Sequence, residues 1–192
     1  MKMLIKKYSL ILLLAVCSFM AASPANAASP EIIGPNMRIV DNNIIVSISI
    51  DNFKDLEKTI KAGIKKEIVF TAELLRSWNL WPDEFIVSKR FEKIIKYDNL
   101  RDQYLASSYD GITRVQKKFK NYEEMKNWIS GLNTFNLANT KGLEPSYYYI
   151  RIVVESKSLD QIPLLGVLTN FIPAIEMSLA KESAPFRVGN NK

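Results

Sequence analysis

Carboxylates are the side chains of this sequence with the clearest potential for acid–base chemistry. Asp98 and Asp102 lie four positions apart, with Glu92 and Asp110 nearby in the chain. Two such groups in one pocket could hydrolyse a glycosidic bond, since glycosidases hold a carboxylate pair about 5 to 10 Å apart. Aspartate is also a common turn residue, because its side chain accepts hydrogen bonds from nearby backbone N–H groups. We favour the turn interpretation and keep a histidine-free hydrolase with paired carboxylates as the alternative.

The chain contains no histidine, and its only cysteine is Cys17. Ser-His-Asp and Cys-His catalytic sites therefore cannot form, and a zinc site would lack its usual ligands. Asp98, Asn99 and Asp102 could offer oxygen ligands to calcium, but they do not follow the spacing of an EF-hand loop. The sequence predicts no metal site and no cofactor.

Two tryptophans lie within the short corner Trp78-Asn79-Leu80-Trp81-Pro82-Asp83. If this corner projects, Trp78, Trp81 and Asp83 could bind a ligand, a partner or a bilayer interface, where an indole is favoured by its apolar body and polar N–H. If the corner folds back, both indoles would close one end of the core. We expect the folded-back arrangement and retain the three residues as candidate binding residues.

Strand-borne polar residues give weaker candidates. Tyr147, Tyr149 and Arg151 would lie on the outer face of one strand and could bind a sugar or peptide, although tyrosine is also simply a good strand residue. Basic side chains gather on two further segments: Lys89, Arg90, Lys93 and Lys96, and Arg114, Lys117, Lys118 and Lys120. These could contact anionic lipids or glycans, but charged strand residues more often protect a sheet edge or coat a solvated face.

The elements that must position these residues are mainly strands. Apolar and polar residues alternate along residues 66–97, which predicts two long antiparallel arms joined by the Trp78–Asp83 corner. The same patterning predicts four further elements: a hairpin over 37–50, short strands over 103–107 and 112–119, and a strong strand over 146–156. Residues 133–145 read as irregular apart from a brief strand near 135–137.

Two short helices interrupt the strands. Leu56 and Ile60 follow Asp51-Asn52 at helical spacing, which predicts a helix over 53–62 that ends at Gly63 in the left-handed conformation. Asn121 and Glu124 form a capping arrangement for a second helix over 122–131. The predicted fold class is therefore α+β and β-dominated, as an antiparallel β-sandwich or strongly curved sheet with two short helices.

The first 27 residues have the pattern of a cleaved signal peptide. Three lysines precede the apolar run from Leu10 to Val16, and Ala25-Asn26-Ala27 forms a cleavage motif before Ala28. The alternative is a lipoprotein anchored at Cys17. We expect a periplasmic or secreted protein with a connector over 28–36, one β-rich domain over 37–188 and a disordered tail over 189–192.

Cleavage would change the charge of the chain. The 27 leader residues carry three lysines and no acidic residue, so the formal charge falls from +6 to +3 and the only cysteine is lost. A charge this small outside the cytoplasm argues against nucleic-acid binding. Prolines and polar residues interrupt the apolar stretch over 162–179, so no transmembrane span is expected in the mature chain.

Several of these features together resemble a bacterial domain-of-unknown-function family, number 4390. The resemblance extends over about residues 37–160 and is carried by the Trp78–Asp83 corner, by Tyr97-Asp98-Asn99-Leu100-Arg101-Asp102-Gln103-Tyr104 and by the late strand Tyr149-Ile150-Arg151-Ile152. It implies an exported protein with this fold and supplies no mechanism. We expect a non-catalytic binding or interaction module of the cell envelope. It would contact an envelope protein or glycan through the corner and an exposed strand edge.

Overall fold

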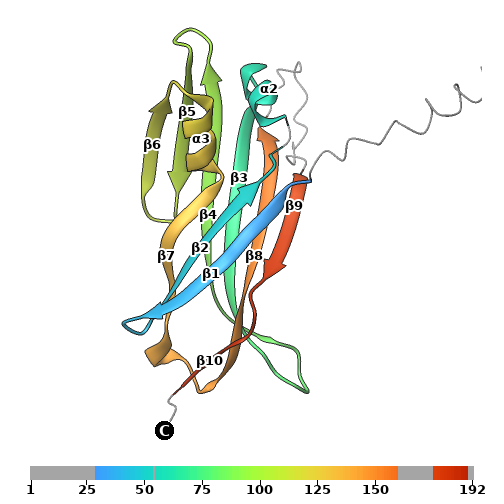
Figure 1. Cartoon of the computed structure of the whole chain (residues 1–192), viewed down its shortest axis with the longest axis vertical. Coiled ribbons are helices and arrows are strands. Elements are labelled where there is room, and N and C mark those ends of the chain that lie inside the picture. The colour runs from blue at the N-terminus through green and yellow to red at the C-terminus, as the bar shows by residue number, and fades with distance from the viewer. Residues whose placement is uncertain (1–28, 54, 160–174, 190–192) are drawn as a thin grey trace, which may run out of the picture.

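The computed structural model describes residues 29–53, 55–159 and 175–189, which form two antiparallel sheets and two short helices (Figure 1). The smaller sheet has the order β1 (Glu31–Val40), β2 (Asn43–Asp51) and β7 (Gly131–Asn139). The larger sheet has the order β10 (Phe186–Val188), β8 (Ser146–Leu159), β3 (Lys65–Arg76), β4 (Glu84–Asp98), β5 (Gln103–Tyr109) and β6 (Arg114–Phe119). The remaining strand, β9 (Ile175–Glu182), pairs with β8 beyond β10. The predicted β-dominated α+β fold class is confirmed.

The core lies between the two sheets and is centred on β3. This strand pairs with β8 over its whole length and with β4 from Lys66 to Arg76, with one register shift between Leu74 and Leu75. Its even-numbered residues face the smaller sheet, and Ile68, Phe70, Ala72 and Leu74 are fully buried. Ile44 and Val46 of β2 are equally buried opposite them. The alternation in the sequence therefore predicted which face of each strand enters the core.

Helix α2 (Leu56–Lys61) ends as predicted but begins later. Gly63 has φ +89°, its N–H donates to the Ile60 carbonyl, and the Ile64 N–H donates to the Thr59 carbonyl. These two bonds form a Schellman motif, for which glycine is favoured. The predicted start near residue 53 is wrong, because the N-cap is Asp55 and not Asp51 or Asn52.

Helix α3 (Tyr122–Ile129) is capped as predicted, since the Asn121 side chain accepts from the N–H groups of Glu123 and Glu124. It packs beside β5 and β6, and its buried residues are Met125 and Ile129. The helix stops before the predicted end because Gly131 already begins β7.

The first strand begins earlier than predicted. We expected residues 28–36 to form a connector, but β1 starts at Glu31 and pairs with β2 from there. The register shifts between Ile33 and Asn36, and Gly34 has φ +100° at this irregularity. The glycine and proline that suggested a connector therefore lie inside a strand, at a bulge that accommodates them.

Three other strands were missed or underestimated. The segment from 133 to 139 belongs to β7, although asparagines interrupt its apolar pattern. Both β9 and β10 were missed, because only alternate side chains of β9 are half-buried and β10 has three residues. The predicted leader, its cleavage site at Ala27 and Ala28, and the lipidation alternative at Cys17 lie outside the described residues. Within the described ranges, no helix has the length and apolar character needed to cross a membrane.

Lys93 is a buried cation in the core, which the sequence did not predict. It belongs to a set expected to coat a solvated face, but its exposed fraction is only 4%. The ammonium donates to the carbonyls of Trp128, at 2.6 Å, and Gly131, and it lies 4.9 Å from the Trp128 ring centre. Lys93 thus connects β4 to the end of α3, where a cation is favoured by the helix dipole.

The pKa of Lys93 predicts how stability depends on pH. Burial, reinforced by the charge of Lys117, lowers this pKa from 10.5 to about 8. Between those values the unfolded chain holds the proton and the folded chain has lost it, so the free energy of unfolding rises with pH. The gain attributable to Lys93 is at most roughly 3 kcal/mol.

Urea unfolding of the wild type and Lys93→Gln at about pH 7 and about pH 10 measures this contribution. The variant keeps an N–H donor for the two carbonyls but does not titrate, so the wild type should gain stability relative to it as pH rises. Lys96→Gln, at an exposed position of the same strand, is the matched control. Equal pH dependence of Lys93→Gln and wild type would contradict the assignment.

Candidate functional site

The connection between β3 and β4 projects from one end of the sandwich, seen at the lower right of Figure 1. Three large apolar side chains of the connection are exposed, Leu80 by 90%, Trp81 by 76% and Trp78 by 41%, and so is Phe85 at the start of β4, by 57%. We call these four residues the aromatic tip. The expectation that Trp78 and Trp81 fold back to close the core is wrong.

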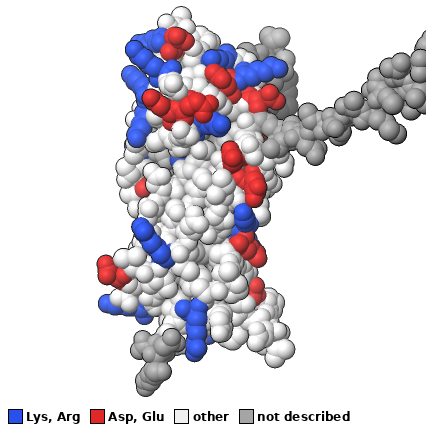
Figure 2. Space-filling model, in the orientation of Figure 1, with Lys and Arg blue, Asp and Glu red and all other residues white. Residues whose placement is uncertain are grey.

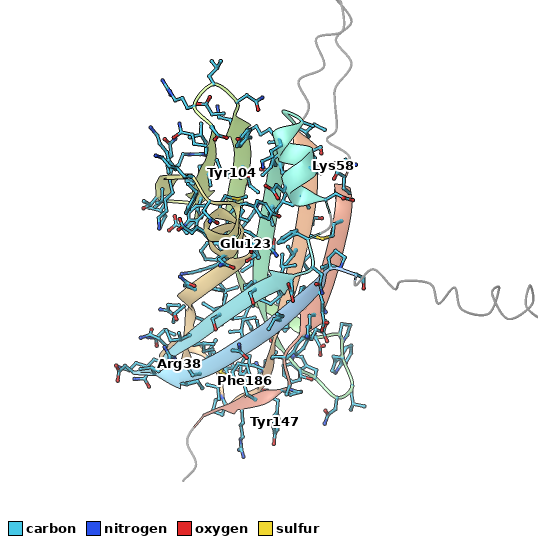
Figure 3. The ribbon with its side chains drawn as sticks, turned by 45° about the horizontal axis from the view of Figure 1, so that its top comes forward. Arg38, Lys58, Tyr104, Glu123, Tyr147 and Phe186 are labelled. Carbon is cyan, nitrogen blue, oxygen red and sulfur yellow. The ribbon has the colours of Figure 1, made fainter. Side chains whose placement is uncertain are left out.

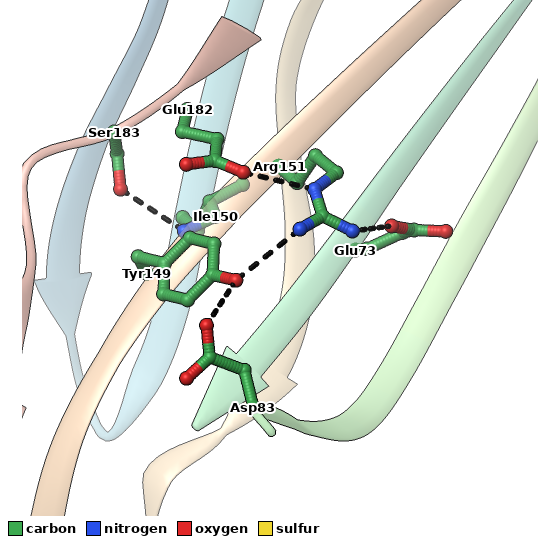
Figure 4. A network of polar contacts seen from close by, with 7 residues as sticks. All are labelled: Glu73, Asp83, Tyr149, Ile150, Arg151, Glu182 and Ser183. Atoms are coloured by element: carbon green, nitrogen blue, oxygen red, sulfur yellow. Dashed lines mark hydrogen bonds and ion pairs between the residues drawn. The ribbon is translucent and has the colours of Figure 1, made fainter. Parts of the chain in front are cut away.

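Asp83 closes the connection that carries the aromatic tip. Its Oδ1 accepts a hydrogen bond from the Trp78 N–H at 3.1 Å, which joins the two ends of the turn. Its Oδ2 accepts from the hydroxyl of Tyr149 on β8 at 2.7 Å. The Asp83 carboxylate therefore joins the two ends of the turn and also bonds the turn to β8, and Figure 4 shows the second of these bonds.

Arg151 extends this network across three strands. Its Nη2 donates to the Tyr149 hydroxyl at 3.3 Å, and its Nε donates to Oε1 of Glu182 on β9 at 3.0 Å. Its Nη1 lies 3.7 Å from Oε2 of Glu73 on β3. Tyr149 is itself buried, so these polar groups are directed at one another (Figure 4). The structure brings Asp83, Tyr149 and Arg151 together as a support for the tip.

Arg76 supports the tip from the other side and was not among the predicted residues. Its guanidinium carbon lies 4.3 Å from the centre of the Trp78 ring, a cation–π contact. Its Nη1 donates to Oε2 of Glu144 at 2.7 Å and lies 3.6 Å from Oε2 of Glu84. A basic residue two positions before a tryptophan, at the end of a strand, was the available sequence signal.

The charges in this support are fixed near neutral pH. The hydrogen bond from Tyr149, followed by that from the Trp78 N–H, lowers the pKa of Asp83 below its usual 3.8. Burial and the bond to Asp83 raise the pKa of Tyr149 above its usual value of 10.0. Neither group is poised to exchange a proton near neutral pH, so the arrangement suits positioning and not general acid–base catalysis.

Tyr147 is the remaining predicted residue and lies beside the base of the tip. Its carbonyl accepts the Ser77 N–H at 2.9 Å, and its side chain is exposed and points away from the body (Figure 3). On its other side, Arg187 of β10 is its partner in the strand register and is also exposed. Tyr147 therefore lies between the base of the tip and β10.

The carboxylates considered for hydrolysis occupy turns and strand surfaces. Asp98 accepts from the N–H groups of Leu100 and Arg101, and Asp110 accepts from those of Ile112 and Thr113. Asp98 and Asp110 lie beyond opposite ends of β5. Asp102 accepts from the Tyr97 hydroxyl, and Glu92 pairs with Arg90. The backbone N–H groups that Asp98 and Asp110 accept from match the turn interpretation for these two residues.

Tyr97 and Tyr104, which begin and end the most specific run of the family resemblance, anchor α2. Their ring centroids are 4.9 Å apart, and the Tyr104 hydroxyl donates to Oε1 of Glu57 at 2.9 Å. Lys61 lies 2.7 Å from the same Glu57 oxygen and 5.9 Å from each ring centre. The run therefore packs a helix onto the sheet at the end opposite the tip.

No group of three or more potential metal-ligating side chains occurs among residues 29–53, 55–159 and 175–189. A hollow of about 180 Å³ lies on the smaller sheet, away from the tip. It is lined by Asn36, Met37, Arg38, Ile45, Val46, Ser47 and Thr134. Its lining offers no carboxylate and no aromatic side chain.

The sequence of the chain matches a known protein family. The family model described as Domain of unknown function (DUF4390) matches residues 27–167. The chain belongs to DUF4390. No match was found among curated proteins or among solved structures. The DUF4390 match confirms the predicted family resemblance and includes the aromatic tip, Asp83, Tyr149 and Arg151, while β9 and β10 lie beyond it.

The hydrogen bonds of Tyr149 to Asp83 and Arg151 predict that removing its hydroxyl destabilises this DUF4390 protein. Tyr149→Phe removes the hydroxyl that joins Asp83 to Arg151 and should lower the free energy of unfolding by about 1 kcal/mol at neutral pH. Tyr147→Phe alters an exposed hydroxyl on the same strand and is the matched control. Equal stability of the two variants in urea unfolding would refute the network.

The difference in unfolding free energy between wild type and Tyr149→Phe should depend on pH. The folded-state pKa of Asp83 is depressed, so its stabilisation is fully present above the usual carboxyl value of 3.8 and is lost as pH falls through the folded-state pKa. The stability difference between wild type and Tyr149→Phe should therefore shrink in acid. A difference that stays constant as pH falls below 3.8 would show that the bond does not depend on the carboxylate.

Proposed function

We propose that the protein is a non-catalytic interaction module of the cell envelope whose contact surface is the aromatic tip. The observation that carries the proposal is the exposure of Trp78, Leu80 and Trp81 on one short connection and of Phe85 at the start of the strand that follows it. Clustered exposed apolar side chains on a soluble fold are typical of interaction sites, whereas single ones are common everywhere.

The support beneath the tip strengthens the proposal. Apolar side chains that served only the core would be more stable folded inward. Here the bonds from Trp78 and Tyr149 to Asp83, and the Arg76 contact with the Trp78 ring, hold the connection in an outward conformation. A contact surface held in its binding conformation loses less conformational entropy on association.

The location of the module rests on the predicted signal peptide. Its charged start, apolar run and Ala25-Asn26-Ala27 motif support export to the periplasm or beyond. An envelope protein or glycan is the class of partner that export would bring into reach. The edge of β6, where Arg114, Lys117 and Lys118 are exposed, is a second surface at which an extended segment could pair.

Site-specific photocrosslinking tests the module in intact cells. A benzoylphenylalanine at position 80 should form adducts with other envelope molecules, because Leu80 is 90% exposed at the centre of the tip. The same probe at position 100 is the control, since Leu100 is 98% exposed on the turn between β4 and β5. Adducts at position 80 and few at position 100 are expected. Equal adduct yields at the two positions would refute the tip as the contact surface.

A further inference from the structure

The chemistry of the aromatic tip also points to the kind of surface it contacts. Resting on the proposed function, we propose that the tip inserts reversibly into the interface of a phospholipid bilayer, with Leu80 and Trp81 entering first. The protein would then lie on the membrane surface by one end of its sandwich.

The composition of the tip is that of an interfacial segment. The six residues Ser77-Trp78-Asn79-Leu80-Trp81-Pro82 carry no charge. On the face shown in Figure 2, the lower right corner, where this connection lies, is free of charged side chains. Tryptophan is enriched at the headgroup level of membranes, and leucine gains free energy in the acyl region below it. The order of exposure, with Leu80 and Trp81 highest, places these two side chains outermost.

The shape of the tip favours a bilayer over a folded protein. The connection projects outward, and the hollow of the smaller sheet lies elsewhere, beside Ser47 and Thr134. A protein partner that buried a projecting Leu80 and Trp81 would need a complementary pocket. A bilayer needs none, because lipid chains rearrange around an inserted side chain.

Two backbone N–H groups at the base of the tip already have hydrogen-bond partners. The N–H of Trp78 is bonded to Asp83 and that of Ser77 to the Tyr147 carbonyl, which lowers the cost of moving this backbone into a drier environment. Arg76 is paired with Glu144 at 2.7 Å, so its charge is balanced where the connection meets the body. Arg187, exposed beside Tyr147, is positioned to contact lipid phosphates.

Other exposed apolar residues lack this arrangement, among them Leu100 on the β4–β5 turn and Ile112 on the β5–β6 turn. Leu100 and Ile112 are 98% and 90% exposed, but each lies on a turn next to charged neighbours. Arg101 follows Leu100 directly, and Asp110 lies two positions before Ile112. Isolated side chains of this kind are ordinary turn features, so Leu80 and Leu100 provide a test and a control within one chain.

Vesicle flotation with the purified full chain tests the inference. The probe is phosphatidylcholine vesicles with and without phosphatidylglycerol, and the variants are Leu80→Asp and the control Leu100→Asp. Residues 1–27 are identical in all three proteins, so any contribution from them cancels. We expect the vesicle partition coefficient of Leu80→Asp to fall about tenfold or more, with Leu100→Asp equal to wild type.

Tryptophan emission gives a second readout in the same samples. Trp78 and Trp81 remain in both variants, so a blue shift on vesicle addition reports burial of the tip in lipid. The shift should occur in wild type and Leu100→Asp and be lost in Leu80→Asp. An equal loss of partition in both variants would overturn the inference.

The result also separates this inference from the proposed function. If the wild type does not bind vesicles while the probe at position 80 still crosslinks to an envelope protein, the bilayer inference fails and the interaction module stands. If the wild type does not bind vesicles and the probe at position 80 forms no more adducts than the probe at position 100, the bilayer inference and the proposed function both fail.

Discussion

The pairing of β3 with a strand on each side is the constraint on which the rest of the structure depends. Because β8 follows β3 from Lys65 to Arg76 and β4 follows it from Lys66 to Leu74 without a register shift, the odd and even faces of the three strands are fixed together over most of their length. The even face of β3 forms the core. The odd face brings Glu73 and Arg151 to the same row, and the end of the strand places Arg76 and Tyr149 beside the connection to β4. The register of β3 with β8 therefore determines where the aromatic tip lies.

The tip itself shows how a small fold can keep apolar side chains in water. Exposing Leu80 and Trp81 costs free energy relative to burying them. The network from Asp83 through Tyr149 to Arg151 and Glu182 fixes the outward conformation by joining the connection to β8 and β9. Two strands that the sequence pattern underestimated or missed, β1 and β9, flank one another, since the Lys181 ammonium of β9 donates to the Ile32 carbonyl of β1. The edge of the larger sheet thus contributes both to the core and to the support of the tip.

Much of the fold could be predicted because its signals are local. The alternation along residues 66–97 and 146–156, the Asn121 cap and the left-handed Gly63 all depend on neighbouring residues. The exposure of Trp78 and Trp81 could not be predicted, because it depends on Asp83 meeting a tyrosine 66 positions later. The burial of Lys93 escaped prediction for the same reason, since its two carbonyl acceptors belong to residues after β6. Residue types identified the candidates, and long-range contacts decided which of them are exposed on the tip and which support it.

Lys93 combines a lowered pKa with burial, and together these make its amine reactive only when the surrounding structure opens. A lowered pKa makes a lysine amine more nucleophilic near neutral pH, yet this amine is covered by the Trp128 ring and held by two carbonyls. Amine-reactive reagents can reach it only when α3 moves away from β4. The rate of its chemical modification would therefore measure how often the end of this helix opens in the otherwise native protein.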